Sequence, residues 1–558
     1  MLALWLAGCS TVPLPRWSNP VQPLPTSAAG GNVLGPVDFS TGAPLPYGPA
    51  VAARFPDPAV VYSTPGLATG RDTFSSNAEV QNWLRALANP AAAAPGVRTG
   101  LIALGSSQRG TPLEALVLTR AAATDPATLS DSARPTVLLI GQQHGNEPAS
   151  AEALMVIARE LAQGLLVPLL QKVNVIVVPR ANPDGAADNQ RATADGTDMN
   201  RDHLLLKTPE SRALARLMRD YRPLVVVDAH EYTVAGRYLE KFGAVQRFDA
   251  MLQYATTANM PEFVTKAAEE WLRLPMVAAL EGERLSSDWY STTSTDPADR
   301  RLSMGGVEPD TSRNVNGLKN AISLLIETRG VGIGRLHIQR RVHTQVVAIS
   351  SVLRSTASRD EQLRRVREFV DRDVASQACA KDVVLQAALT PERRTVLMID
   401  PATGADRAID VDWLSALKLQ TTKTRMRPCG YWLSADEGET VERLRLLGLQ
   451  VFKIATDASL IADSYREVAA STGGRQDVRG VILGEAPVRK TQVDLVRAPL
   501  VAQAGSYYVP VNQPLGSLAV AALEPDSQSS YYANNLVGEL SHVQRLMTNP
   551  TLTFEDER

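Results

Sequence analysis

Two residue types that bind metals stand three positions apart in one turn of this sequence. His144 and Glu147 follow the apolar run 136–140, whose β-branched and aliphatic residues predict a buried strand. Residues 149–161 after them show helical periodicity. Both side chains are therefore expected in the turn between a strand and a helix, where open α/β sheets bind ligands. An imidazole and a carboxylate at this spacing can reach one metal ion.

Four later stretches place more polar groups beside apolar runs. Residues 173–178 predict a second buried strand, and the turn sequence Asn-Pro-Asp-Gly follows it at 182–185. The loop 191–202 carries arginine, aspartate and asparagine. A third apolar run leads to His230, and a fourth carries Glu327 where a strand interior should be apolar. His-x-x-Glu alone would indicate only a solvated turn, whereas the five stretches together favour a site.

A His, Glu and His set with one open position is typical of a catalytic zinc site, because a fourth protein ligand would leave no bound water. The chain contains six histidines: His144, His203, His230, His337, His343 and His542. Only His144 and His230 lie at the ends of apolar strands. His203 is the alternative third ligand, but it follows Asn-Arg-Asp in a polar loop. We interpret His203 as a surface group or as a group that contacts one of the metal-binding residues.

These motifs, in this order, resemble the M14 family of zinc carboxypeptidases. The shared pattern is His-x-x-Glu, Asn-Pro-Asp-Gly, Asp-x-Asn-Arg, a histidine at a strand end and a glutamate on a late strand. The motifs span residues 135–330, and the resemblance covers the globular part from about residue 62 to about residue 376. It implies one Zn²⁺ per chain and a peptide substrate.

The resemblance implies that His144, Glu147 and His230 bind the zinc. Glu327 would be the general base that takes a proton from the zinc-bound water and passes it to the leaving amine. Asp198 would orient His144 through the ring nitrogen that faces away from the metal. Zinc lowers the pKa of its water to about 7, so this chemistry can run at neutral pH.

Three further residues gain roles from the same resemblance. Asn200 and Arg201 would bind the C-terminal carboxylate of the substrate, because arginine matches a carboxylate with two parallel hydrogen bonds. Arg191 would stabilise the oxyanion. The alternatives are that Arg191 is a surface cation, that Asn200 caps a turn and that Asp198 fixes its own loop. Glu327 could instead pair with Arg329, since a buried charge is costly unless it is used or paired.

Well-known members of the family carry a tyrosine on a mobile loop before the general base. Residues 305–319 contain no tyrosine in this chain. Three tyrosines elsewhere are candidates for that role: Tyr232, Tyr238 and Tyr290. The same segment should form the specificity pocket, and it is polar, with Asp310, Ser312 and Arg313. Its polarity argues against a large apolar terminal residue in the substrate.

The composition is that of an ordinary globular protein, with 44% hydrophobic and 21% charged residues. Its 558 residues imply two domains, or three. A net charge of -2 gives no electrostatic basis for binding nucleic acid. No run of eighteen apolar residues occurs, so no transmembrane helix is predicted.

Leu-Ala-Gly-Cys at residues 6–9 resembles the lipobox of bacterial lipoproteins, in which the cysteine is lipidated. The alternative is a chance apolar N-terminus. Ser10 after Cys9 resembles the outer-membrane sorting preference, and residues rich in Pro, Gly, Ser and Ala suit a tether. We therefore expect a periplasmic protein anchored to the outer membrane. Cys379 and Cys429 remain, and they are either paired in that oxidising compartment or free thiols.

Alternating strands and helices predict a three-layer αβα domain with a mixed sheet. From about residue 382, short β-prone runs and turn signals predict a strand-rich α+β accessory domain. The expected organisation is a signal and lipobox remnant at 1–9, a tether at 10–58, a zinc carboxypeptidase domain at 59–378 and an accessory domain at 379–558.

The sequence therefore predicts a zinc metallocarboxypeptidase that removes a C-terminal residue from peptides or trims peptidoglycan stem peptides. One alternative is a zinc amidohydrolase of acylated amino acids, similar to the aspartoacylases. Asn-Pro-Asp-Gly followed by Asp-x-Asn-Arg argues for the peptidase. The other alternative is a non-catalytic lipoprotein that binds peptide ends, although a competent residue fills every catalytic position.

Overall fold

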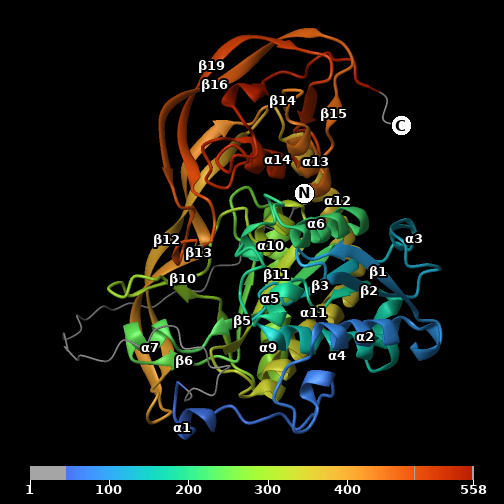
Figure 1. Cartoon of the computed structure of the whole chain (residues 1–558), viewed down its shortest axis with the longest axis vertical. Helices are drawn as coiled ribbons and strands as arrows, with labels where there is room; N and C mark the ends of the chain where they lie inside the picture. Colours follow the sequence, from blue (N-terminus) through green and yellow to red (C-terminus); the bar gives the residue numbers. More distant parts are fainter. Residues whose placement is uncertain (1–45, 483, 556–558) are drawn as a thin grey trace, which may run out of the picture.

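The computed structural model describes residues 46–482 and 484–555 (Figure 1). A lower lobe, coloured blue to yellow, contains the motif strands, and an upper lobe, coloured orange to red, contains most of the later part of the chain. The lipobox pattern with Cys9, and the tether as far as residue 45, lie outside the described residues.

The lower lobe is built on an eight-stranded sheet of order β1-β2-β4-β3-β5-β11-β7-β8. The four central strands β4, β3, β5 and β11 are parallel, whereas β1, β2 and β7 join through antiparallel pairings, so the sheet is mixed. The strands are β1 Arg98–Ser106, β2 Pro112–Thr119, β3 Thr136–Gly141, β4 Asn174–Val178, β5 Val225–Thr233, β7 Ala250–Tyr254, β8 Ser287–Trp289 and β11 Ile322–Val331.

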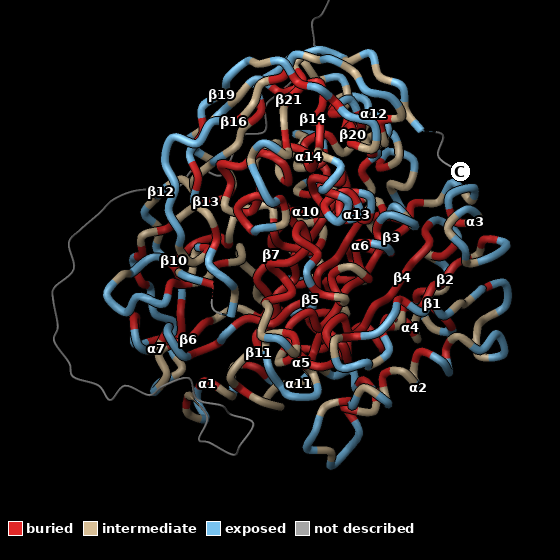
Figure 2. The backbone as a smooth tube through the Cα atoms, turned by 45° about the horizontal axis from the view of Figure 1, so that its top comes forward, coloured by how far each residue is buried: buried red, intermediate tan, exposed pale blue. Residues whose placement is uncertain are grey.

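Helices cover both faces of this sheet. Along β3, Leu139 packs into one core and Leu138 into the other, because successive side chains of a strand point to opposite faces. The first core is closed by α2 Asn77–Ala88, α4 Pro148–Gln163, α9 Leu274–Gly282, α11 Ile338–Ser358 and α12 Asp360–Ser376; the second is closed by α3 Pro126–Asp131 and α6 Pro209–Tyr221. Figure 2 shows the buried chain concentrated along the strands and helices between these layers. The predicted three-layer architecture is confirmed.

The later part of the chain is rich in strands, as predicted, and its described residues contribute to two larger sheets and one two-stranded sheet. The hairpin of β12 Asp382–Ile399 and β13 Asp406–Met426 forms a five-stranded sheet with β6 Val245–Gln246, β9 Thr292–Thr293 and β10 Arg301–Ser303. Beyond it, α13 Gly438–Leu447 and α14 Gly516–Leu523 accompany a sheet of order β15-β20-β14-β21-β16-β19. Those strands are β14 Gly430–Leu433, β15 Phe452–Lys453, β16 Ala458–Gly473, β19 Val488–Ala502, β20 Tyr507–Pro510 and β21 Val543–Leu546. The boundary at residue 379 stays a prediction, because the hairpin after it pairs with earlier strands.

Two contacts join the lobes near this junction. Cys379 and Cys429 form a disulfide, the pairing that the sequence left open. The buried hydroxyl of Tyr531 donates to the carbonyl of Leu204 at 3.0 Å, so Tyr531 packs between the lobes.

Residues 46–58 belong to the packed part of the chain, although the sequence placed them in the tether. They include the short helix α1 Pro49–Ala52, and Val51 and Phe55 are buried beside Ile399. Among the described residues, no helix is both long and apolar enough to cross a membrane.

A buried ion pair fastens α11 to β5. Arg341 lies 2.7 Å from Glu231, both side chains are almost fully buried, and Glu231 also accepts the backbone N–H of Ala149. Removing one partner leaves a buried charge uncompensated, so we expect Arg341→Met to lower the free energy of unfolding by about 3–5 kcal/mol. The urea unfolding midpoint measures this change.

The matched control is Arg466→Met, whose pair with Asp494 on β16 and β19 is exposed. Its loss should cost about 1 kcal/mol or less. Equal midpoints for the two variants would contradict the importance given to the buried pair.

Candidate metal centre and active site

The motif residues meet because their strands are parallel neighbours. His144 and Glu147 lie in the turn from β3 into α4, and His230 lies on β5 beside β3. Glu327 on β11 is the direct register partner of His230. The carboxyl-terminal parts of three adjacent strands thus bring four side chains to one edge of the sheet, the edge at which parallel α/β sheets bind ligands.

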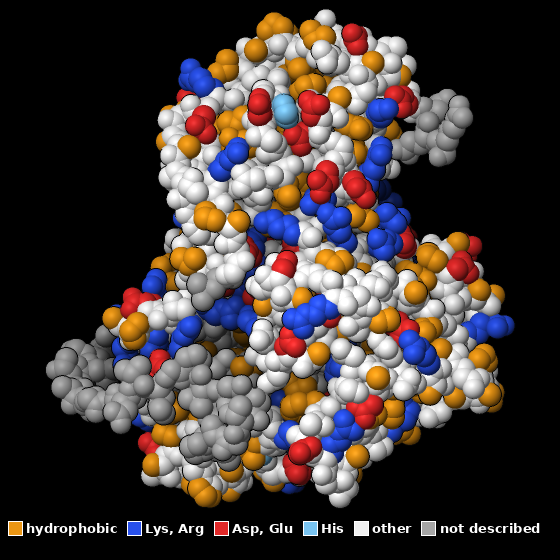
Figure 3. All heavy atoms as spheres, viewed as in Figure 1, with side chains coloured by type: hydrophobic (Ala, Val, Ile, Leu, Met, Phe, Trp, Pro, Cys, Tyr) orange, Lys and Arg blue, Asp and Glu red, His pale blue; other side chains and the backbone are white. Residues whose placement is uncertain are grey.

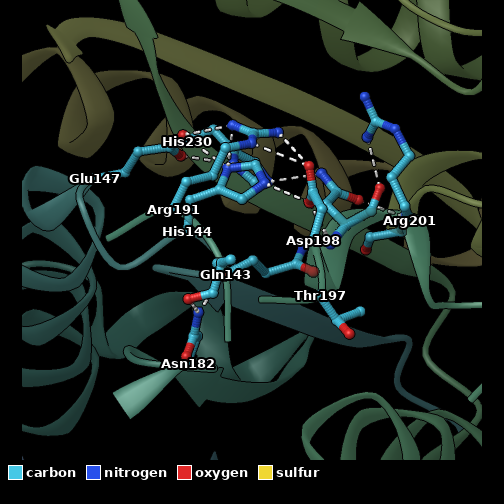
Figure 4. Close-up of polar contacts among 12 residues, drawn as sticks. Gln143, His144, Glu147, Asn182, Arg191, Thr197, Asp198, Arg201 and His230 are labelled. Atoms are coloured by element: carbon cyan, nitrogen blue, oxygen red, sulfur yellow. Dashed lines mark hydrogen bonds and ion pairs between the residues drawn. The ribbon is translucent and has the colours of Figure 1, made fainter. Parts of the chain in front are cut away.

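Three donor atoms converge on one point. Nδ1 of His144 and Nδ1 of His230 lie 2.7 Å from the two carboxylate oxygens of Glu147, and 3.1 Å from each other. Figure 4 shows these three side chains pointing toward one another. Two ligands on a tetrahedral zinc stand about 3.3 Å apart, which follows from bond lengths of about 2.0–2.1 Å. The nitrogen and oxygen atoms therefore fit a zinc ion, and His144, Glu147 and His230 form a buried group that could hold a metal ion.

Each imidazole has an aspartate on its other nitrogen. Nε2 of His144 lies 3.1 Å from Asp198, and Nε2 of His230 lies 2.8 Å from Asp228. An N–H donated to a carboxylate leaves the lone pair of Nδ1 directed at the centre. The structure thus places Asp198 where the resemblance implied, and it adds Asp228 as an equivalent partner.

The carboxylates around the two rings favour positive charge at this point. Burial disfavours the charged form of His230, but Asp228 and Glu147 outweigh burial and raise its pKa well above the usual value. Burial likewise opposes ionisation of Glu147, yet His144 and His230 lower the pKa of its carboxyl. Such a group of buried carboxylates and imidazoles suits a bound cation.

Glu327 is buried beside the donor atoms. Burial, and then the nearby Glu147, raise the pKa of Glu327 to about 8, against the opposing influence of His230 and Arg191. Among the described residues, its Oε2 is buried without a hydrogen-bond partner. Arg329 stacks instead on Phe55, 3.5 Å from the ring centroid, and donates to the carbonyl of Gln246. The alternative that Glu327 pairs with Arg329 is therefore not what the structure shows.

Asn-Pro-Asp-Gly holds two loops of the site together. Asn182 donates from Nδ2 to the carbonyls of Gln143 and Ala192, so it connects the turn after β3 with the loop that carries Arg191. A Cβ at Gly145 would lie 1.9 Å from the backbone of Gly185. Only glycine at position 145 permits this close approach of the two turns.

Arg191 lies inside the site rather than on an outer surface. Its Nε donates to Asp198 at 3.0 Å, and its Nη1 lies 3.2 Å from Nδ1 of His144 and 3.5 Å from Glu147. The positively charged guanidinium of Arg191 thus lies directly beside the donor atoms of His144 and Glu147.

Asn200 and Arg201 also line the cavity. Oδ1 of Asn200 accepts the backbone N–H of Ser312, which joins the loop to α10 (Ser312–Leu318). Arg201 donates from Nη1 to the carbonyl of Asn200 at 2.7 Å and from Nη2 to Asp477 at 2.8 Å. Asp477 belongs to the later part of the chain, a contact that the sequence did not indicate.

His203 is buried, so the surface interpretation is wrong. Its Nε2 lies 2.6 Å from Oε1 of Gln143, and Gln143 donates to Asp228. His203 therefore contacts the partner of a candidate ligand and is not itself a ligand.

A cavity of about 140 Å³ opens onto the donor atoms, and all three candidate tyrosines line it. The hydroxyl of Tyr232 donates to the carbonyl of Phe248, and that of Tyr238 donates to the carbonyl of Ser291. Tyr290 lies against the guanidinium of Arg313. Burial, and then Glu327, raise the pKa of the Tyr290 phenol.

The sequence missed two groups of site residues. Asp228 stands two positions before His230, and side chains at that spacing share one face of a strand, so this signal was present. Val478 and Arg479 line the cavity from a turn more than 150 residues after Glu327, and no local pattern marks them.

Parts of this chain are similar to known carboxypeptidases. Residues 81–239 match the family model Peptidase_M14, described as zinc carboxypeptidase. Carboxypeptidase 2 from Trichophyton equinum is 28% identical over 399 residues, which cover 71% of this chain and 72% of the relative. Carboxypeptidase 2 from Trichophyton rubrum is also 28% identical, and the match covers 72% of this chain and 74% of that relative. A metallo-carboxypeptidase structure from Burkholderia cenocepacia aligns with 15% identity and a TM-score of 0.37, covering 51% of this chain and 70% of that chain.

The matched family model and the sequence relatives define the class of protein as a metallocarboxypeptidase, a hydrolase. Residues 81–239 resemble the M14 zinc carboxypeptidase family, and that family implies zinc. The donor atoms of His144, Glu147 and His230 fit that metal.

Asp228 provides a test of this centre. Loss of a carboxylate partner of a metal-binding histidine typically weakens metal binding about 10- to 100-fold, so we expect that loss from Asp228→Asn. Competition with a fluorescent zinc chelator measures it. Glu437→Gln is the control, because Glu437 contacts the distant His542. Wild-type zinc affinity in Asp228→Asn would contradict the role given to Asp228.

Proposed function

We propose that the protein removes the C-terminal residue from peptides that end in a free carboxylate, peptidoglycan stem peptides among them. The observation that carries this proposal is one cavity lined by His144 and Glu147 of the donor group, by the buried carboxylate of Glu327 and by several arginines. The donor atoms suit a hydrolytic metal, the carboxylate suits a general base, and the guanidinium groups suit an anionic substrate end.

His144, Glu147 and His230 would hold zinc, with Asp198 and Asp228 fixing the two rings. Zinc, when bound, supplies Lewis acidity, which brings the pKa of a coordinated water to about 7. Glu327 accepts the proton from the attacking water and transfers it to the leaving amine. Its buried position favours the protonated carboxyl that this second step needs.

The arginines act on the substrate. Arg191 presents its charge beside the donor atoms, where negative charge develops on the carbonyl oxygen, and a preoriented cation there stabilises the transition state. Asn200 and Arg201 bind the terminal carboxylate. Tyr290 is the tyrosine that closes over the substrate, because the hydroxyls of Tyr232 and Tyr238 donate to backbone carbonyls.

Replacement of the base separates catalysis from metal binding. Glu327→Gln should lower kcat about 100- to 10,000-fold while the zinc content stays at that of the wild type, because the amide cannot accept the proton. Mass spectrometry of a diverse peptide pool, supplied as free acids and as C-terminal amides, measures the turnover. Glu361→Gln on α12 is the control, because its ion pair with Arg365 is exposed.

Loss of one residue from free acids only, absent with Glu327→Gln, is the expected result. Turnover by Glu327→Gln at the wild-type rate would contradict the role of this base. Cleavage of neither peptide form by the wild type would contradict the peptidase proposal, and acylated amino acids would then be the substrates to examine.

Metal removal gives a second, independent prediction. A chelator should abolish peptide cleavage, and one equivalent of Zn²⁺ should restore it, because the donor set holds one ion. Atomic absorption after dialysis gives the stoichiometry. His144→Ala should lose both the zinc and the activity, whereas His542→Ala should keep both. Full activity of the metal-free protein would overturn the mechanism.

We further propose that the protein is lipidated on Cys9 and faces the periplasm from the outer membrane. The lipobox pattern supports the anchor, and the disulfide between Cys379 and Cys429 suits an oxidising compartment. Expressed in a bacterial host with its natural leader, Cys9→Ser should lose incorporation of a labelled fatty acid and leave the membrane fraction. Equal labelling of the variant and the wild type would contradict the anchor.

A further inference from the structure

A turn from the later part of the chain forms one wall of the active-site cavity. β17 (Gln476–Asp477) and β18 (Gly480–Val481) make a two-stranded hairpin, and Val478 and Arg479 at its turn line the cavity with Glu327. Figure 3 shows Lys and Arg side chains gathered at the waist between the lobes, the level at which the chain passes from one lobe to the other. The hairpin therefore brings charge from one lobe into the site of the other.

The hairpin is fixed on both sides. The buried guanidinium of Arg475 donates to the carbonyl of Arg201 at 2.8 Å and to Glu485 at 2.6 Å. On the opposite side, the backbone N–H of Thr295 donates to the carbonyl of Arg479 at 2.8 Å. Such contacts hold the turn in a defined place beside the loop that carries Asn200 and Arg201.

Asp477 holds two arginines next to each other. One carboxylate oxygen accepts from Nη2 of Arg201 at 2.8 Å and lies 3.5 Å from Nε of Arg479. The other oxygen accepts the backbone N–H of Arg479 at 2.7 Å. Asp477 is thus shared between the guanidinium groups of Arg201 and Arg479.

The guanidinium of Arg479 makes only long contacts with the carboxylates around it. It lies 3.5 Å from Asp477 and 3.9 Å from Asp198, both longer than the usual 2.7–3.2 Å of an N–H···O bond. The nearby Arg191, and then burial, lower its pKa, so the cations repel one another. Arg201 already uses both of its terminal nitrogens on protein acceptors.

We propose that Arg479 is a substrate-binding residue that joins Arg201 in holding the terminal carboxylate of the peptide, and that Asp477 positions both guanidinium groups. The inference rests on the proposed function and extends it, since the later part of the chain then completes the active site. An arriving carboxylate relieves the repulsion among the arginines and gains charge-assisted hydrogen bonds from Arg479.

The test uses the full chain with its zinc and a peptide substrate found with the wild type. Arg479→Gln should raise KM for the free acid about 10- to 100-fold, the loss expected for one hydrogen bond to a charged group, with kcat changed much less. Arg479→Lys should give an intermediate KM, because lysine keeps the charge without the planar fork. Asp477→Asn should raise KM although Arg479 is present. Arg466→Gln, in the exposed pair on β16, is the control and should equal the wild type.

Binding supplies a readout that does not depend on turnover. In the Glu327→Gln background, titration calorimetry with the uncleaved free-acid peptide should show an about 10- to 100-fold higher Kd when Arg479→Gln is added. The amidated peptide should bind weakly and equally to both proteins. Matching zinc content and melting temperature show that the variants are folded.

The outcomes separate this inference from the proposed function. An active wild type together with unchanged KM and Kd in Arg479→Gln overturns the role of Arg479 alone. A change shared equally by the amidated peptide also overturns it, because the effect would not involve the carboxylate. A wild type that cleaves no free-acid peptide overturns the proposed function instead.

Discussion

The site depends on the orientation of two buried imidazoles, those of His144 and His230. Nε2 of each ring contacts an aspartate, and Nδ1 of each ring faces the carboxylate of Glu147. The contacts to Asp198 and Asp228 set the orientation of the rings, and the parallel strands set their positions. Burial makes the arrangement costly, since so many carboxylates in one place need a cation. The two helical layers, with their cores on both faces of the sheet, provide the rigid frame that keeps these atoms together.

The two lobes act on the same cavity. The lower lobe supplies the donor atoms and Glu327, whereas the hairpin after β16 supplies Arg479 and the carboxylate that engages Arg201. The shared five-stranded sheet, the disulfide and the contact of Tyr531 with Leu204 fix the lobes to each other. A region that the sequence suggested only as an accessory is thus part of the wall that would meet the end of a substrate.

The fold could be predicted from the sequence, and the candidate donor residues could be proposed from it, because both leave local signals. Apolar runs marked the central strands, and His144, Glu147, His230 and Glu327 stand at or near their ends. Asp228 also left a signal, its spacing from His230 on one strand face. The partnership of Arg201 with Asp477 left none, because 276 residues separate them and only the packing of the lobes joins them. The burial of His203 was likewise missed, since a polar loop gives no sign that another element covers it.

The most direct test of the account is a crystal structure of the Glu327→Gln variant with zinc and a free-acid peptide bound. Zinc should lie on Nδ1 of His144, the carboxylate of Glu147 and Nδ1 of His230, with the scissile carbonyl beside Arg191. The terminal carboxylate should lie between Arg201 and Arg479. Zinc on other residues, or a peptide whose carboxylate points out of the cavity, would contradict it.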